Sequence, residues 1–210
     1  MPSKSVKLNR NTISCKESQG KKGTNHSREV ILKAAIAEFS ERGFDGARME
    51  TISNKAGYNK SLVYRYFTDK KGLFRAALKF KLQERGELFS HMPKDLAKNL
   101  NYWFRETLRD PEYLRLLIRE ALNDDGGEIV EQDSRRHYYK NHVNAARQMQ
   151  KSGQLSSAYD PECFIIAVIA LILFPAVFPQ VVRLVTGRKV TSQSFRRRWN
   201  QLLTQLAETL

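Results

Sequence analysis

A group of hydrogen-bond donors at helical spacing lies between Met49 and Phe67, where the sequence reads METISNKAGYNKSLVYRYF. Asn59 can cap a helix here by accepting a backbone N–H of its first turn. At about 100° per residue, the residues that follow divide into two sectors. The inner sector holds Leu62, Val63, Tyr66 and Phe67, and the outer sector holds Lys60, Ser61, Tyr64 and Arg65. Arg and Lys donate to guanine edges and phosphates, Ser contacts either, and a Tyr hydroxyl reaches a phosphate, so the outer sector is suited to DNA.

A second helix must precede this one and hold it in place. Ile52 and Ala56 repeat at i, i+4, and Gly57 follows where a helix commonly ends in a left-handed residue. A helix, a glycine-containing turn and another helix form the helix-turn-helix motif, whose second helix enters the DNA major groove. The alternative is an ordinary amphipathic helix with a solvated basic face.

The charge of the chain favours a polyanionic partner. The 210 residues carry a formal net charge of +14, which indicates nucleic acid or an anionic membrane surface. Residues 1–90 contain 19 Lys and Arg against 9 Asp and Glu, whereas residues 91–210 contain 17 against 13. The positive charge is therefore concentrated around the helix-turn-helix pattern.

The cysteines and the N-terminus favour a cytoplasmic protein. Cys15 and Cys163 have no paired spacing that would indicate a disulfide framework or a zinc site, and a reducing cytosol fits them best. Basic residues near the N-terminus are not followed by an apolar stretch, so this segment does not read as a secretory signal.

The N-terminal part of the chain reads as a tail followed by a DNA-binding domain. Residues 1–26 are rich in Ser, Asn, Lys and Gly, which predicts a disordered basic tail. A helix beginning at His26 or Ser27 has apolar residues at i, i+3, i+4 and i+8 and ends at Gly43. With the helix-turn-helix and the helix that follows it, we predict a DNA-binding domain and its connecting helix over residues 27–90.

The pattern from residue 91 to residue 210 is helical throughout. Breaks containing Gly, Pro and Asp separate helices near 95–108, 112–122, 128–152, 160–186 and 192–208. No strand-like alternation is present, so we predict an all-α protein with a second, larger helical domain over residues 91–210.

Aromatic and large apolar side chains in this second part are candidates for a ligand pocket. Such pockets are lined mainly by apolar groups with a few polar ones. The candidates are Tyr102, Trp103, Phe104, Tyr113, Leu117, Tyr138 and Tyr139, with His142 as a polar group that could orient a ligand. Aromatic residues at helical spacing also serve as ordinary core, and that alternative stays open.

The run from Cys163 to Pro179 is apolar on all sides of a helix, which indicates burial. A membrane span is the alternative, although the run is short for one and contains Pro175. With the apolar stripe of the last helix, this run predicts a dimer interface of four helices, two from each protomer. The candidate interface residues are Ile169, Leu173, Phe195, Trp199, Leu202, Leu203 and Leu206.

The spacing of R28…IL…AA…EF…RGF, then I52…AG, then S61-L-V-Y-R-Y-F-T-D-K, resembles the tetracycline-repressor (TetR) family of bacterial transcriptional regulators. The resemblance is dense from Arg28 to about Leu78, and beyond that it is to the general layout of the family only. It implies that residues 91–210 form a ligand-binding and dimerisation domain.

The resemblance also implies which residues contact DNA. The positions that usually do so in the family fall on Lys60, Ser61, Leu62, Tyr64, Arg65 and Tyr66, and its phosphate-binding lysine falls on Lys70. For Leu62 and Tyr66 this differs from the helical wheel, which turns both inward. The chain departs from the family before the second helix, where Ala47 and Arg48 replace a capping Thr or Ser, and Arg48 could contact phosphate directly. Lys71 should strengthen binding to the DNA backbone.

These features predict a repressor that binds an inverted-repeat operator as a homodimer and responds to an unknown small molecule. A membrane-attached basic protein that uses residues 163–179 is the alternative. An enzyme is not supported, because the four histidines show no metal spacing and no glycine-rich phosphate loop is present. We expect no catalytic residues, no metal and no cofactor.

Overall fold

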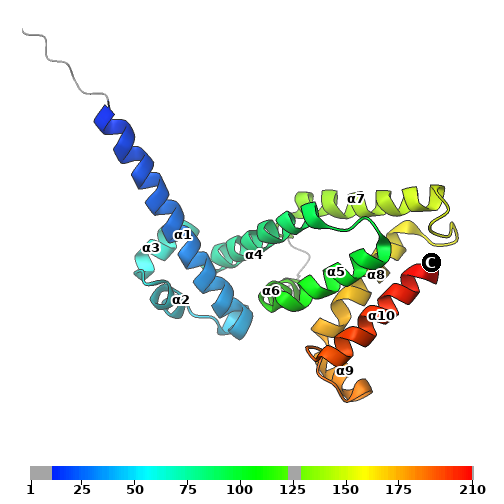
Figure 1. Cartoon of the computed structure of the whole chain (residues 1–210). Helices are drawn as coiled ribbons and strands as arrows, with labels where there is room; N and C mark the ends of the chain where they lie inside the picture. Colours follow the sequence, from blue (N-terminus) through cyan, green and yellow to red (C-terminus); the bar gives the residue numbers. More distant parts are fainter. Residues whose placement is uncertain (1–10, 123–128, 210) are drawn as a thin grey trace, which may run out of the picture. The chain divides into compact units, whose positions relative to one another are not determined.

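All regular secondary structure is helical in the residues that the computed structural model describes, 11–122 and 129–209 (Figure 1). In chain order the elements are α1 (Asn11–Gly46), α2 (Met49–Ala56), α3 (Lys60–Phe67), α4 (Lys70–Glu87), the 3-10 helix η1 (Leu88–His91), α5 (Leu96–Arg109), α6 (Pro111–Leu122), α7 (Gln132–Lys151), α8 (Pro161–Val177), α9 (Pro179–Thr186) and α10 (Gln193–Thr209). This confirms the predicted all-α class. The chain divides into two compact units between Ala77 and Leu78, inside α4. The domain boundary after residue 90 stays a prediction.

Helix α1 begins earlier than we predicted from the sequence. Its first residue is Asn11, not His26 or Ser27, so residues 11–26 of the predicted disordered tail are helical. A helix anchored by a buried stripe can extend through polar residues, because each added residue gains one hydrogen bond after nucleation. Gly43 interrupts α1 with φ 73° and ψ 179°, where the sequence predicted the helix to end. The tail prediction for residues 1–10 lies outside the described residues.

The core of the first unit packs against one face of α3. Fully buried apolar side chains come from four helices: Ile31, Ala35 and Phe39 of α1, Ile52 of α2, Val63 of α3, and Leu73 and Ala77 of α4. The rings of Phe39, Phe44 and Phe74 contact one another with centroids 5.3 to 6.2 Å apart. The outer side of α3 takes no part in this packing.

A buried carboxylate ties α1 to α2. The Glu38 side chain is 1% exposed, and its Oε2 accepts a hydrogen bond of 2.8 Å from Lys55 Nζ. Its Oε1 lies 3.4 Å from Nε of Arg42. A buried carboxylate is costly unless it is paired. Lys55 therefore fixes the position of α2, the helix that leads into the turn before α3.

The first turn of α4 lies close to the backbone at the end of α3. Asp69 caps α4, because its Oδ1 accepts a hydrogen bond of 2.6 Å from the Gly72 N–H. A Cβ atom built on Gly72 would lie 2.5 Å from the backbone oxygen of Phe67. Only glycine fits at position 72 without a shift of the backbone.

The core of the second unit is built mainly from α5, α8, α9 and α10. Its buried side chains are Leu100, Trp103, Phe104, Ile172, Val182, Phe195 and Leu203. Helix α5 packs against both α8 and α10, and α7 packs against α8 (Figure 1). The predicted single helix over 160–186 is two helices, because Pro179 cannot continue α8 and instead begins α9.

No single helix in the described part of the chain has both the length and the apolar composition of a membrane span. The pair α8 and α9 meets these criteria together, but the two helices are bent by 81° relative to each other.

Candidate DNA-binding helix and ligand cavity

The two helices of the helix-turn-helix pattern lie where the sequence predicted them. Gly57 ends α2 in the left-handed conformation, with φ 71° and ψ 23°. The side chain of Asn59 then caps α3 by accepting a hydrogen bond of 2.8 Å from the Leu62 N–H. Val63 and Phe67 are buried. Helix α3 is thus a short, capped helix held by one face.

The opposite face of α3 is exposed. It presents Lys60, Ser61, Tyr64 and Arg65. Leu62 and Tyr66 are half-buried, so they lie at the edge between the sector assigned by the wheel and the face implied by the family. Lys60 Nζ lies 5.9 Å from the centre of the Tyr64 ring, and the Arg65 guanidinium lies 6.0 Å from that of Tyr66. Cations beside aromatic rings on one exposed face suit contacts with phosphates and base edges.

Three further basic residues predicted to contact DNA lie near the starts of α2 and α4. Arg48 is the exposed N-cap residue of α2 and makes no side-chain capping bond. Lys71 is exposed in the first turn of α4. Lys70 is more constrained, because its Nζ donates to the Asp45 backbone oxygen at 3.2 Å and lies 5.0 Å from the centre of the Phe44 ring.

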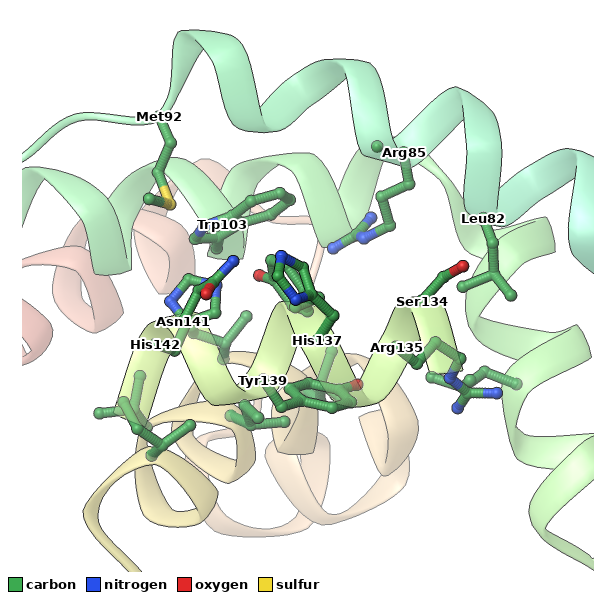
Figure 2. Close-up of a pocket in the computed structure, with 18 of the residues that line it drawn as sticks. Leu82, Arg85, Met92, Trp103, Ser134, Arg135, His137, Tyr139, Asn141 and His142 are labelled. Carbon is green, nitrogen blue, oxygen red and sulfur yellow. The ribbon is translucent and has the colours of Figure 1, made fainter. Parts of the chain in front are cut away.

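The second unit contains a cavity of about 730 Å³, within the range of natural ligand pockets (Figure 2). It lies among α4, α5, α6, α7 and α8. Of the predicted ligand residues, those that line it are Trp103, Tyr113, Leu117, Tyr138, Tyr139 and His142. Tyr102 and Phe104 do not. Tyr102 donates its hydroxyl hydrogen to the Leu88 backbone oxygen at 3.0 Å, and Phe104 is buried in the core, 1% exposed.

Several other residues line the cavity that the sequence pattern did not predict. They include Arg85 of α4, Met92, the α7 residues Ser134, Arg135, His137 and Asn141, and the α8 residues Ile165, Val168 and Ile172. Figure 2 shows Arg85 extending from α4 toward α7, with Trp103 beside it. Arg85 stands in the sequence KLQERGE, where a charged residue reads as part of a solvated face. Only its position over the cavity identifies it.

Burial changes the acid–base properties of the lining residues. It raises the pKa of the Tyr138 hydroxyl and of the Tyr113 hydroxyl, although the positive charge of Arg85 opposes both shifts. It lowers the pKa of His142, whose ring lies 4.3 Å from that of Tyr138. Both tyrosines are therefore neutral at pH 7, and His142 is mainly neutral.

Two other charged residues of the lining are paired. Arg135 Nη1 donates to Oε2 of Glu120 at 2.7 Å. Glu131 Oε1 accepts a hydrogen bond of 2.8 Å from Lys79 Nζ. In the part of the chain that the structure describes, no group of three or more His, Cys, Asp and Glu side chains could hold a metal ion.

Two of the residues predicted for the dimer interface lie inside the protomer, which corrects the assignment for these two; for the other five it stays a prediction. Phe195 and Leu203 are in the core, 5% and 0% exposed, so a partner chain cannot cover them. Trp199 is half-buried and stacks on Phe195 with ring centroids 5.7 Å apart. Ile169 and Leu173 line the cavity. Of the predicted set, only Leu202 is exposed, at 38%, and Leu206 is half-buried.

A different apolar surface is exposed on α8. Ile166, Ala170 and Phe174 recur every four residues, and Ile166 and Phe174 are 67% and 45% exposed. We call these three residues the α8 outer face. Phe178, Leu184 and Val185, between the end of α8 and the end of α9, are also exposed. Large exposed apolar patches mark interaction surfaces.

Both parts of the chain match models of the same protein family. Residues 31–77 match the family described as "Bacterial regulatory proteins, tetR family", and residues 95–205 match the "Tetracyclin repressor-like, C-terminal domain". The HTH-type transcriptional repressor SCO4008 of Streptomyces coelicolor is 29% identical over 157 residues, 75% of this chain and 82% of that protein. The HTH-type transcriptional repressor NicS of Pseudomonas putida is 31% identical over 106 residues, 47% of this chain and 50% of that protein.

Solved structures show the same fold. SCO4942 of Streptomyces coelicolor has a TM-score of 0.73 at 21% identity, covering 86% of this chain and 97% of that one. AibR, solved in complex with isovaleryl coenzyme A and operator DNA, has a TM-score of 0.69 at 16% identity, with the same coverage of 86% and 97%.

Proposed function

The chain belongs to the TetR family of DNA-binding bacterial transcriptional regulators, and we propose that it is a repressor that binds an inverted-repeat operator as a homodimer and is released by a small molecule. The observation that carries this proposal is the exposed face of α3, opposite two side chains buried in the core.

In this proposal, α3 enters the major groove with Lys60, Ser61, Tyr64 and Arg65 toward the bases and phosphates, and Leu62 and Tyr66 contact DNA at the edge of the face. Arg65 is best suited to a guanine edge, because a guanidinium can donate to O6 and N7 together. Arg48, Lys70 and Lys71 add phosphate contacts. An operator partner also assigns the protein to the cytoplasm.

The cavity of the second unit is the proposed effector site. Its volume of about 730 Å³ and its apolar and aromatic lining support a small organic ligand. SCO4008 and NicS are named as repressors. AibR, which has a similar fold, holds an acyl-coenzyme A and operator DNA in one structure, so this fold is compatible with both kinds of ligand.

The α8 outer face is the proposed centre of the homodimer interface. Its spacing of four residues produces a stripe along the helix that a second copy of α8 can cover. Leu202 and Leu206 of α10 extend this surface in the proposal. A symmetric dimer presents two α3 helices, and this requires an operator with two inverted half-sites.

The test begins with a selection of genomic DNA fragments bound by the purified protein, and affinities are then measured by fluorescence anisotropy. Arg65→Ala should weaken operator binding by about 1–3 kcal/mol and weaken binding to random DNA less. The matched control is Arg197→Ala, which removes an exposed arginine from α10 in the second unit. Equal losses on operator and random DNA would remove Arg65 from base recognition, and a selection that yields no common inverted repeat would contradict the operator.

A further inference from the structure

Arg85 lies in the wall of the cavity and contacts both rings and a hydroxyl group of neighbouring helices. Its guanidinium lies 5.0 Å from the centre of the Trp103 ring and 4.6 Å from that of Tyr113. Its Nη2 donates a hydrogen bond of 3.2 Å to Oγ1 of Thr107. These contacts attach α4 to α5 and α6 and turn the charged group toward the cavity that Figure 2 shows.

One end of this guanidinium is buried without an acceptor. Within the described residues, Arg85 Nη1 has no hydrogen-bond partner, although it is shielded from solvent. A donor in this situation normally costs about 1–3 kcal/mol, and more if it is charged. The two aromatic rings attract the positive charge but accept no strong hydrogen bond from Nη1.

The other charges of the lining do not neutralise Arg85. Arg135 is paired with Glu120, and Glu131 is paired with Lys79. No described carboxylate lies within 4.0 Å of the Arg85 guanidinium, which leaves the cavity with a single uncompensated positive charge. Such a charge in an apolar wall favours an anion from outside the chain.

A second buried polar atom without a partner in the described structure belongs to another residue that lines the cavity. Nε2 of His142 is buried and makes no hydrogen bond. His142 comes from α7, whereas Arg85 comes from α4, so the cavity has polar groups on two walls. The α8 wall, with Ile165, Val168 and Ile172, is aliphatic.

We propose that the effector is an apolar organic carboxylate whose carboxylate accepts hydrogen bonds from Arg85 and whose apolar body lies against Trp103 and the aliphatic α8 wall. This inference rests on the proposed role of the cavity as the effector site. One carboxylate matches one uncompensated cation, and His142 supplies a neutral hydrogen-bonding group for a second polar atom of the ligand.

A purely structural role for Arg85 is the competing explanation. In that case Arg85 joins three helices through Thr107, Trp103 and Tyr113, and the cavity has no preference for charge. A structural role explains the hydrogen bond of Nη2 and the ring contacts. It does not explain why Nη1 is buried without a hydrogen-bond acceptor. The two explanations differ in one measurable property, the preference of the protein for an anion over a neutral ligand of the same shape.

The experiment uses the full chain without DNA and two probes, 2-naphthoate and 2-naphthamide. They share an apolar body and differ in the charge of one group. Binding is measured by isothermal titration calorimetry and by the shift in the unfolding temperature at millimolar probe. Naphthoate should bind the unaltered protein about 10- to 100-fold more tightly than naphthamide, the ratio expected for charge-assisted hydrogen bonds. Decanoate and decanamide repeat the comparison with an aliphatic body.

Two variants test whether Arg85 causes the preference for the carboxylate over the amide. Arg85→Gln should remove it, so that naphthoate and naphthamide bind equally. Arg105→Gln is the matched control and should keep it, because Arg105 also lies over a ring, 5.3 Å from the centre of Tyr102, but does not line the cavity. If Arg85→Gln does not fold, the comparison of the two probes on the unaltered protein still decides the question.

The proposal is overturned if the unaltered protein binds acid and amide equally, binds only the amides, or binds none of the four probes. It is also overturned if Arg85→Gln retains the preference. The proposal that the protein is a repressor is tested separately, because its test measures operator binding. A protein that prefers carboxylates but has no operator would keep this inference and lose the DNA-release mechanism.

Discussion

The proposed dimer makes a quantitative prediction for the α8 outer face. Ile166 and Phe174 are 67% and 45% exposed in one chain. Full burial of such side chains contributes about 1.5–3 kcal/mol each. Covering the exposed parts should therefore contribute about 1–2 kcal/mol for Ile166 and about 0.7–1.4 kcal/mol for Phe174. Because a two-fold axis repeats each contact, the total is about 3–7 kcal/mol of dimer free energy.

The double variant Ile166→Glu, Phe174→Glu removes this contribution and also places carboxylates where the partner would bury them. We expect the dimer dissociation constant to rise by at least two orders of magnitude, since about 1.4 kcal/mol corresponds to a factor of ten. The monomer should remain folded, because both positions are exposed in a single chain. Operator affinity should fall although α3 is unchanged.

Sedimentation velocity from nanomolar to micromolar protein measures the dissociation constant, and circular dichroism checks the fold. Leu122→Glu is the matched control, since Leu122 is 71% exposed but lies at the end of α6. A monomeric unaltered protein at micromolar concentration, or a double variant that dimerises as well as the control, would refute the α8 interface. Leu203→Glu would not be a useful test, because it would bury a charge in the protomer's own core.

Three further predictions concern the DNA-binding unit and the cavity. Lys70→Ala should weaken binding to all DNA sequences and reduce the slope of log affinity against log salt by about one unit, whereas an unchanged slope would mean that Lys70 serves only its contact with Asp45. Lys55→Met should lower the free energy of unfolding by about 1–3 kcal/mol by leaving the Glu38 carboxylate without its short hydrogen bond. Adding Glu38→Gln should recover part of this loss in urea titrations, and simple additivity of the two changes would contradict the coupling. Burial lowers the pKa of His142 below its ordinary value of 6.5, so the unfolded chain binds a proton that the folded chain releases. Stability should therefore fall as the pH drops below about 6.5, and His142→Asn should flatten this dependence in unfolding curves measured between about pH 7.5 and 5.

Local signals in the sequence predicted the first unit well. The cap at Asn59, the left-handed Gly57 and the buried Val63 are properties of a few neighbouring residues, and the structure has all three. The start of α1 was not predictable in this way. Its first turns contain polar residues whose helical state depends on the stable helix that follows them.

The second unit shows where periodicity is insufficient. The apolar stripe of α10 predicted an interface, but a stripe shows only that something covers it. For Phe195 and Leu203 the cover is α5 of the same chain. Arg85 was missed for a related reason, because a single charged residue in a helix does not reveal that a cavity lies beside it. Aromatic content predicted much of the cavity lining, since large rings leave irregular space between helices.

The surroundings of helix α8 explain why its sequence resembles a membrane span. Ile165, Ile169 and Ile172 line the cavity, whereas Ile166 and Phe174 are exposed on the outer face. Neither side has a polar stripe, because one side lines the cavity and the other is proposed to contact a second protomer. Hydropathy alone does not distinguish these surroundings from lipid.

The close passage at Gly72 bears on how operator specificity could be re-engineered. Val63 and Phe67 carry the packing of α3, so the outward residues can be exchanged for those of another regulator without disturbing the interior. Position 72 allows no such exchange, because even a methyl group would collide with the Phe67 carbonyl oxygen and displace the end of α3. A chimaera that transplants the outward residues of α3 should therefore leave this glycine in place, and a library aimed at new operators should randomise the outer sector only.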